Sequence, residues 1–175
     1  MELSAAIDFI GNDNSSRQPG AVWADLGCGS GLFTFALAHL LASGSTVYGV
    51  DKNPVNFGSL LPPEGIRILS IQLDFVADAL PMRDLDGILM ANSLHYVRDK
   101  TALIDKLSAY MKPGGRFLIV EYDTDVPAPQ WVPYPVSFQS LKRLFENAVY
   151  ASVRKLGERP SVFRRAGMYA ALIAH

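Results

Sequence analysis

The chain has 175 residues, of which 49% are hydrophobic and 19% are charged. This length suits one domain with its own core, which we expect over residues 1–175, and the composition excludes a disordered chain. Sixteen basic and seventeen acidic side chains give a net charge of −1, which argues against a general binder of nucleic acid or acidic membranes.

The first part of the chain alternates predicted helices and strands. A short amphipathic helix over residues 3–10 is followed by a polar loop over 11–18 and a strand over 21–26. Hydrophobic residues then recur at helical spacing over 32–42, and Gly44 is placed to end that helix. A second strand over 46–50 and a weak helix over 54–61 complete this part.

The second part continues the alternation and then changes character. Nearly continuous hydrophobic runs predict strands over 66–73 and 85–91, a pattern typical of a parallel sheet covered on both faces. A helix over 100–111 ends at Pro113 and Gly114, before a fifth strand over 116–122. A proline-rich segment over 123–135 precedes a helix that begins near Phe138, and runs at 150–156 and 168–174 read as a final strand pair. The order predicts an open α/β sheet.

The strongest chemical signal is Asp25-Leu26-Gly27-Cys28-Gly29-Ser30-Gly31, at the junction of the first strand and the following helix. Glycines there let the backbone approach a ligand, at the sheet edge where open α/β folds bind their ligands. A dinucleotide-binding loop would place its third glycine at position 32, which is Leu32. The Asp25 carboxylate suits an ammonium group and would repel a pyrophosphate.

This Asp-x-Gly-x-Gly-x-Gly segment resembles the first motif of the class I S-adenosylmethionine-dependent methyltransferases. Four further segments resemble motifs of that family in the same order, over about residues 20–122: Asp51 after the second strand, Asp74-Phe75 after the third, the run from Asp86 to His95, and the turn Met111-Lys112-Pro113-Gly114-Gly115-Arg116-Phe117. The resemblance implies a three-layer Rossmann-like fold with strand order 3-2-1-4-5-7-6, a mostly parallel seven-stranded sheet whose last strand is antiparallel.

The resemblance also implies S-adenosylmethionine as the cofactor, with Asp51 on the ribose and Asp74 with Phe75 on the adenine. Asp78 is an alternative to Asp74. The cofactor-binding residues expected on this basis are Asp25, Gly27, Cys28, Gly29, Ser30, Gly31, Asp51, Lys52, Asp74, Phe75 and Asn92. Cys28 reads as a small packing residue rather than a nucleophile.

The implied reaction is methyl transfer to an acceptor that the sequence does not identify. A small molecule methylated on oxygen or nitrogen is favoured. His95 follows the fourth strand and is the candidate general base, because an imidazole can accept a proton near neutral pH. A histidine that only packs against the cofactor or a helix is the alternative. A module that binds the cofactor or its product without transferring a methyl group is the second interpretation, and a nicotinamide-dependent oxidoreductase is the third.

Charge and cysteine usage complete the expectations. Residues 141–175 carry seven basic and two acidic side chains, a weak indication of an RNA or protein acceptor, but a solvated surface is the favoured explanation. The lone Cys28 fits a reducing, cytoplasmic compartment, and the three scattered histidines suggest no metal site. Glu2 and Asp8 argue against a signal peptide, and no hydrophobic run is long enough to span a membrane.

Overall fold

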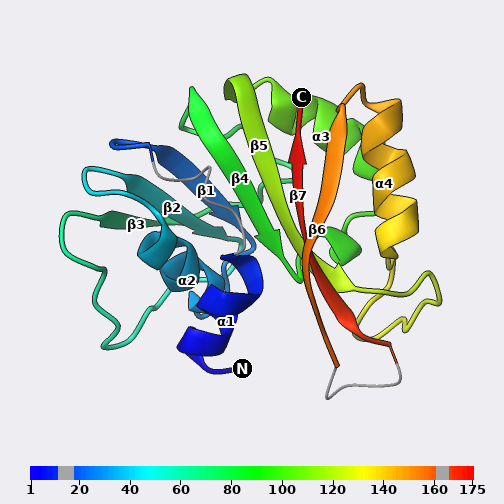
Figure 1. Cartoon of the computed structure of the whole chain (residues 1–175), viewed down its shortest axis with the longest axis horizontal. Helices are drawn as coiled ribbons and strands as arrows, with labels where there is room; N and C mark the ends of the chain where they lie inside the picture. The colour runs from blue at the N-terminus through cyan, green and yellow to red at the C-terminus, as the bar shows by residue number, and fades with distance from the viewer. Residues whose placement is uncertain (12–17, 161–165) are drawn as a thin grey trace.

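The computed structural model describes residues 1–11, 18–160 and 166–175, arranged around one seven-stranded sheet (Figure 1). The strands lie in the order β3-β2-β1-β4-β5-β7-β6. Strands β1 to β5 pair in parallel, and β7 is antiparallel to both β5 and β6. This confirms the predicted strand order and the antiparallel last strand. The strand bounds are β1 Val22–Leu26, β2 Thr46–Asp51, β3 Arg67–Gln72, β4 Leu85–Ala91, β5 Met111–Tyr122, β6 Ser152–Arg159 and β7 Met168–Ala174.

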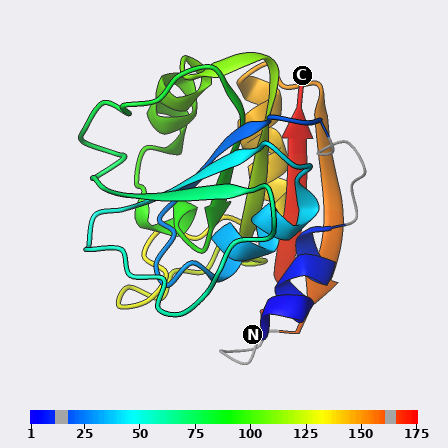
Figure 2. The ribbon, with the colours of Figure 1, turned by 90° about the vertical axis from the view of Figure 1, so that its left-hand side faces the viewer.

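Helices cover both faces of the sheet, so the fold has three layers (Figures 1 and 2). On one face α1 and α2 pack over a core that includes Trp23 and Leu37. On the other face α3 and α4 pack over a second core that includes Ile104 and Phe145. The helix bounds are α1 Leu3–Ile10, α2 Leu32–Leu40, the short 3-10 helix η2 Leu94–Tyr96, α3 Lys100–Ser108 and α4 Phe138–Asn147.

The segment after β2 is a loop and not the helix predicted over residues 54–61. Its Phe57 ring lies where two glycines leave room: a Cβ atom would come within 2.5 Å of the ring at Gly31 and within 2.6 Å at Gly49. The same ring packs edge to face against Phe35, with 5.4 Å between centroids. These contacts outweigh the weak helical tendency of a segment that contains Gly58 and adjoins two prolines.

Other differences concern where elements end. Helix α2 ends at Leu40, because Leu41 is already extended, and Gly44 adopts its positive φ of 84° in the turn before β2 instead of closing the helix. Helix α3 ends at Ser108 rather than at residue 111, since Met111 already pairs with Leu85 in the sheet. Consequently β5 begins five residues earlier than predicted. Strand β6, in contrast, lies further toward the C-terminus than predicted, because its hairpin pairing with β7 continues to residue 159.

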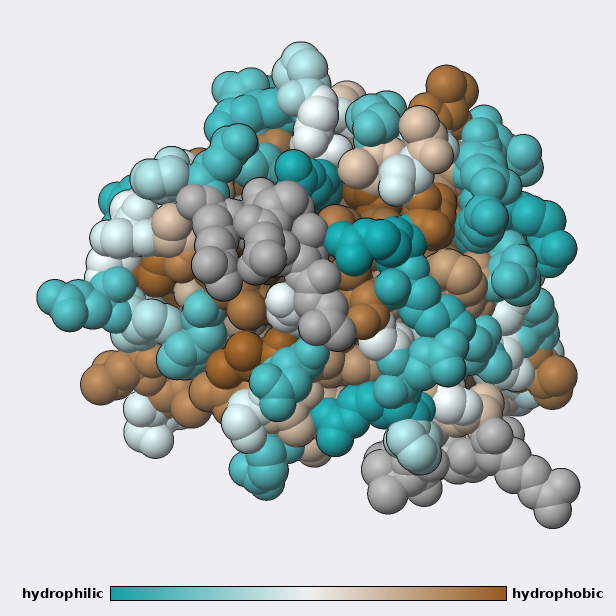
Figure 3. Space-filling view, viewed as in Figure 1, coloured by the Kyte–Doolittle hydropathy of each residue, from teal (hydrophilic) through white to brown (hydrophobic). Residues whose placement is uncertain are grey.

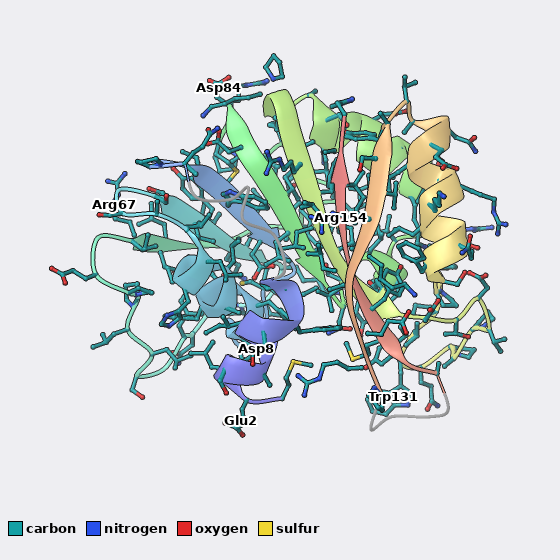
Figure 4. All side chains as sticks on the ribbon, in the orientation of Figure 1. Glu2, Asp8, Arg67, Asp84, Trp131 and Arg154 are labelled. Carbon is teal, nitrogen blue, oxygen red and sulfur yellow. The ribbon has the colours of Figure 1, made fainter. Side chains whose placement is uncertain are left out.

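All five parallel strands end at the same edge of the sheet, the lower edge in Figure 1. Figure 4 places Trp131 at this lower edge and Asp84, which precedes β4, at the opposite one. Open α/β sheets bind their ligands at the carboxyl ends of their strands. The predicted site residues follow strand ends and are therefore brought to this edge.

Two basic side chains of the C-terminal segment form ion pairs with acidic side chains. Lys155 contacts both Asp123 and Glu158, and Lys142 lies 3.8 Å from Glu146 one helical turn away. A band of hydrophilic side chains runs along β6 in Figure 3. These pairs favour a solvated surface at Lys142 and Lys155. Arg164 and Arg165, which contribute to the charge excess, lie outside the described residues.

Candidate cofactor and acceptor site

The glycine loop between β1 and α2 is held against the end of β2. The backbone N–H groups of Gly27 and Cys28 donate to the carbonyl oxygen of Val50 at 2.7 and 3.0 Å. Gly27 must be glycine, because a Cβ atom there would lie 2.5 Å from the Cβ of Ser93. A Cβ at Gly29, in contrast, would meet nothing within 4 Å, although φ is 53°. Gly29 therefore borders open space beside the backbone, as a ligand-binding loop requires.

Asp51 ends β2 and joins this loop. One of its carboxylate oxygens accepts a hydrogen bond from the Gly29 N–H at 3.0 Å, and the other accepts from the Asn53 N–H at 2.9 Å. The glycine loop and the acid at the end of the second strand, predicted separately to bind the cofactor, are thus in direct contact. The side chains of Ser30 and Lys52, also predicted at the site, are exposed at the same edge.

Asp25 is a buried carboxylate with one oxygen unsatisfied. Its Oδ2 accepts from the Thr34 hydroxyl at 2.6 Å, whereas its Oδ1 is buried with no partner among the described residues. Burial raises the pKa of Asp25 to about 7, the negative charge of Asp51 adds to this rise, and the Thr34 hydrogen bond opposes it. A nearby cation would compensate this buried charge.

This raised pKa predicts a stability that depends on pH in the absence of cofactor. Because folding favours protonated Asp25, its contribution is complete below the unfolded pKa of 3.8 and is lost as the pH rises through about 7. We expect the free energy of unfolding of the parent chain, relative to Asp25→Asn, to fall by at most about 4 kcal/mol between pH 4 and pH 8. Urea unfolding at several pH values measures it, and parallel pH profiles for the two proteins would contradict it.

Cys28 lies within the glycine loop but has an unreactive thiol. Burial raises its pKa to about 12, and the negative charges of Asp25 and Asp51 add to the effect. The thiolate that a nucleophile requires is therefore disfavoured at neutral pH. This agrees with the interpretation of Cys28 as a packing residue whose backbone, rather than its sulfur, serves the loop.

The segment after β3 brings Asp74 and Phe75 to the site. The Phe75 ring lies 3.7 Å from the position of a Cβ at Gly27, so it is adjacent to the glycine loop. Asp74 is exposed, and its Oδ1 accepts from the Val76 N–H at 2.9 Å. Asp78, the alternative to Asp74, accepts from the Asp74 N–H at 3.1 Å. Both carboxylates thus stabilise the turn that they belong to.

The end of β4 supplies Asn92 and Ser93. Asn92 has φ of 55°, a conformation that asparagine tolerates better than most residues, and its Oδ1 is buried with no partner among the described residues. The Ser93 hydroxyl donates to the carbonyl oxygen of Leu26 at 2.6 Å. This hydrogen bond holds the end of β4 against the glycine loop, a role that the sequence analysis missed.

His95 and Glu121 form a buried pair. The His95 Nδ1 lies 2.7 Å from the Glu121 Oε2, and the His95 backbone N–H donates to the Glu121 Oε1 at 3.1 Å. Their exposed fractions are 2% and 1%. His95 is therefore enclosed beside the edge rather than open to it, with the exposed ring of Tyr96 centred 4.3 Å away.

Glu121 is the main site residue that the sequence analysis missed. It is the acidic residue of an otherwise hydrophobic run in β5, which was a usable signal, since a buried carboxylate needs a partner. The partner, His95, could be identified only once the register between β4 and β5 was known. Ala91 pairs with Val120, so residues following β4 lie beside Glu121.

The proline-rich segment over residues 123–135, here called the acceptor arm, lies beside His95. The Tyr134 N–H donates to the carbonyl oxygen of His95 at 3.0 Å. The Lys100 ammonium group bridges the carbonyl oxygens of Tyr134 and Val97 at 2.7 and 2.8 Å. Trp131 is 69% exposed near the turn of this arm. The arm is thus hydrogen-bonded to the segment that carries His95.

The strand order, the glycine loop and the acid after β2 together define a Rossmann-like fold of the class I methyltransferases. A family model described as a methyltransferase domain matches residues 2–172. The chain therefore belongs to this methyltransferase family, which confirms the resemblance found in the sequence. S-adenosylmethionine is the cofactor of this class.

Individual relatives are more distant. The chain is 31% identical over 115 residues to the ubiquinone/menaquinone biosynthesis C-methyltransferase UbiE of Shewanella frigidimarina, covering 63% of this chain and 46% of the relative. It spans about half the length of the curated relatives that it matches.

Solved structures share the fold at lower identity. One is a SAM-dependent methyltransferase from Aquifex aeolicus, with a TM-score of 0.63, 16% identity, and coverage of 99% of this chain and 98% of that one. Another is the 1,6-didemethyltoxoflavin-N1-methyltransferase of Burkholderia thailandensis, with a TM-score of 0.71, 19% identity, and coverage of 98% and 77%. Within the described residues, no helix is long and apolar enough to cross a membrane.

Proposed function

We propose that this chain transfers the methyl group of S-adenosylmethionine to a hydroxyl or amino group of a small-molecule acceptor, with His95 as the general base. The observation that carries this proposal is the His95–Glu121 pair, which joins the segment after β4 to β5, two residues beyond the Ser93 that contacts the glycine loop. The glycine loop, Asp25, Asp51 and Asn92 would hold the cofactor, and the acceptor would enter beside the acceptor arm.

The residues at the strand ends fit this cofactor. The unsatisfied buried oxygens of Asp25 and Asn92 favour a cationic, hydrogen-donating group such as the amino group of the methionine end. The open space beside Gly29 leaves room for the ligand. Asp51, half-buried at the end of β2, suits ribose hydroxyls, and the exposed Asp74 with the neighbouring Phe75 ring suits the adenine. When bound, the cofactor supplies a methyl group on a positively charged sulfur.

Asp51 gives this assignment a quantitative test. Replacing Asp51 by alanine removes a charge-assisted hydrogen-bond acceptor, and we expect binding of S-adenosylhomocysteine to weaken by about 1–3 kcal/mol. Titration calorimetry measures the change. Asp86→Ala, which removes an acid at the opposite edge of the sheet, is the control and should leave the affinity unchanged. Equal affinity in Asp51→Ala would place the ribose elsewhere.

The acceptor chemistry follows from the pair in β4 and β5. Because Glu121 takes the Nδ1 side of the imidazole, the Nε2 of His95, which has no hydrogen-bond partner among the described residues, is the nitrogen left to receive a proton. The Nε2 of His95 would accept the proton that the acceptor oxygen or nitrogen loses on methylation, and would later release that proton to solvent. His95 is 2% exposed, and the exposed ring of Tyr96 lies beside it.

Two other functions compete with this proposal. The relatives named as C-methyltransferases make a carbon acceptor in a quinone precursor the second candidate. A module that binds the cofactor without methyl transfer is the third.

A labelling experiment, accompanied by calorimetry, separates these possibilities. The chain is incubated with methyl-labelled S-adenosylmethionine and a metabolite pool, and the labelled products are identified. A methyl group on oxygen or nitrogen supports the proposal, and one on carbon supports the second candidate. Calorimetry with S-adenosylhomocysteine and NADH accompanies it: binding without product supports the third candidate, and binding of NADH alone would overturn all three.

A further inference from the structure

Lys106, near the end of α3, holds the segment that follows β3. Its ammonium group donates to the backbone carbonyl oxygens of Phe75, Val76 and Asp78 at 3.0, 2.9 and 2.6 Å. An ammonium group has three N–H donors, so these three carbonyls use all of them. The contact joins α3 to a segment about thirty positions earlier in the sequence, beside the edge strand β3.

The residues that flank this segment are tied to the fold, since the Leu73 N–H donates to the Asp51 carbonyl oxygen and the Leu80 N–H to the Tyr110 hydroxyl. Within residues 74–78, the hydrogen bonds that the side chains accept are local. Asp74 accepts from the N–H groups of Val76 and Ala77, and Asp78 accepts from the Asp74 N–H. Such local bonds shape a turn, but they do not fix where the turn lies relative to the sheet. The three hydrogen bonds from Lys106 tie it to α3 and so to the body of the fold.

We propose that Lys106 is a positioning residue for cofactor binding, which keeps residues 74–78 where Phe75 lies beside Gly27. This inference rests on the proposed cofactor site, in which this segment contacts the adenine. Most of the carbonyl contacts are exposed, so water can replace the ammonium group when it is removed. The fold then persists while residues 74–78 become less fixed in position. The binding that is lost is that of the adenosine end of the ligand.

The test compares Lys106→Met with Lys142→Met. The control removes an exposed lysine of α4 that pairs with Glu146, far along the chain from the site. S-adenosylhomocysteine and 5′-methylthioadenosine, which share the adenosine group, are titrated into each protein. We expect Lys106→Met to bind both about 10-fold more weakly, by the same factor, because the charged hydrogen bonds act on their common part. Lys142→Met should bind both like the parent chain.

Kinetics add a measurement that a general loss of structure would not reproduce. In Lys106→Met the KM for S-adenosylmethionine should rise about 10-fold while kcat at saturating cofactor stays within about twofold, as expected for a residue that affects binding alone. Lys106→Arg keeps the positive charge and should recover part of the affinity, and it also serves where the methionine variant does not fold.

Three outcomes would overturn the inference. One is parental affinity for both ligands in Lys106→Met; another is a fall in kcat as large as the rise in KM. A third is a loss confined to S-adenosylhomocysteine, which would place the effect at the methionine end. Failure of the parent chain to bind either ligand would instead reject the cofactor site, and with it this inference.

Discussion

Replacing Gly29 by valine is expected to abolish binding of S-adenosylmethionine and S-adenosylhomocysteine while the chain stays folded. The protein itself leaves space at this position, since a Cβ would meet nothing within 4 Å. In the proposed site that space belongs to the methionine end of the ligand, so the branched side chain would exclude it. Calorimetry should detect no binding at ligand concentrations 100 times the parental dissociation constant.

Backbone strain has to be separated from this steric effect. Valine is disfavoured at positive φ, at a cost of about 1–2 kcal/mol. Gly20→Val is the matched control, because Gly20 also has positive φ (73°) and open surroundings but precedes β1, at the opposite edge. Both variants should lose similar stability, and Gly29→Val alone should lose the ligand. Retained binding in Gly29→Val would mean that the ligand does not approach this loop.

Gly27→Ala provides a contrast in the same loop. Its added methyl group would meet the Ser93 Cβ at 2.5 Å, so the end of β4 would have to move away from the loop. We expect this variant to lose stability as well as binding. Two glycines that read alike in the sequence thus serve different purposes, one for packing between strands and one for the ligand.

The strands and the glycine loop could be predicted because their signals are local, whereas the strand order was implied by the resemblance to the family. Short hydrophobic runs between turns define the strands, and the spacing of Asp25 and the three glycines distinguishes this loop from a dinucleotide-binding one. The loop containing Phe57 could not be predicted in this way. Its conformation depends on room left by Gly31 and Gly49, which belong to two other elements.

Glu121 and Lys106 escaped prediction for the same reason. Each acts through a contact between segments 26 to 31 positions apart, and such contacts are determined by strand register and helix placement rather than by spacing in the chain. The resemblance to a family predicted residues that would meet the cofactor. It gave no indication of residues that hold those segments in place.

His95 carries the second large expected effect. His95→Gln and His95→Ala should each reduce turnover by at least about 100-fold if the imidazole receives the acceptor proton, while cofactor affinity stays within a few-fold. His39→Gln is the matched control, because His39 is exposed on α2 and lies outside the proposed site. The measurement is initial rate with saturating cofactor and the acceptor identified from the labelled products.

Glu121 decides how a loss at His95 is to be interpreted. Glu121→Gln keeps an acceptor for the His95 Nδ1 but removes the charge that stabilises a protonated imidazole. If His95 is the base, this variant should lie between the parent and His95→Gln in turnover, with parental KM for the cofactor. If the buried pair serves only to anchor the segment after β4, both substitutions should lower the melting temperature while turnover per folded molecule stays parental. That second result would leave methyl transfer dependent on positioning alone, which an in-line displacement from a sulfonium permits.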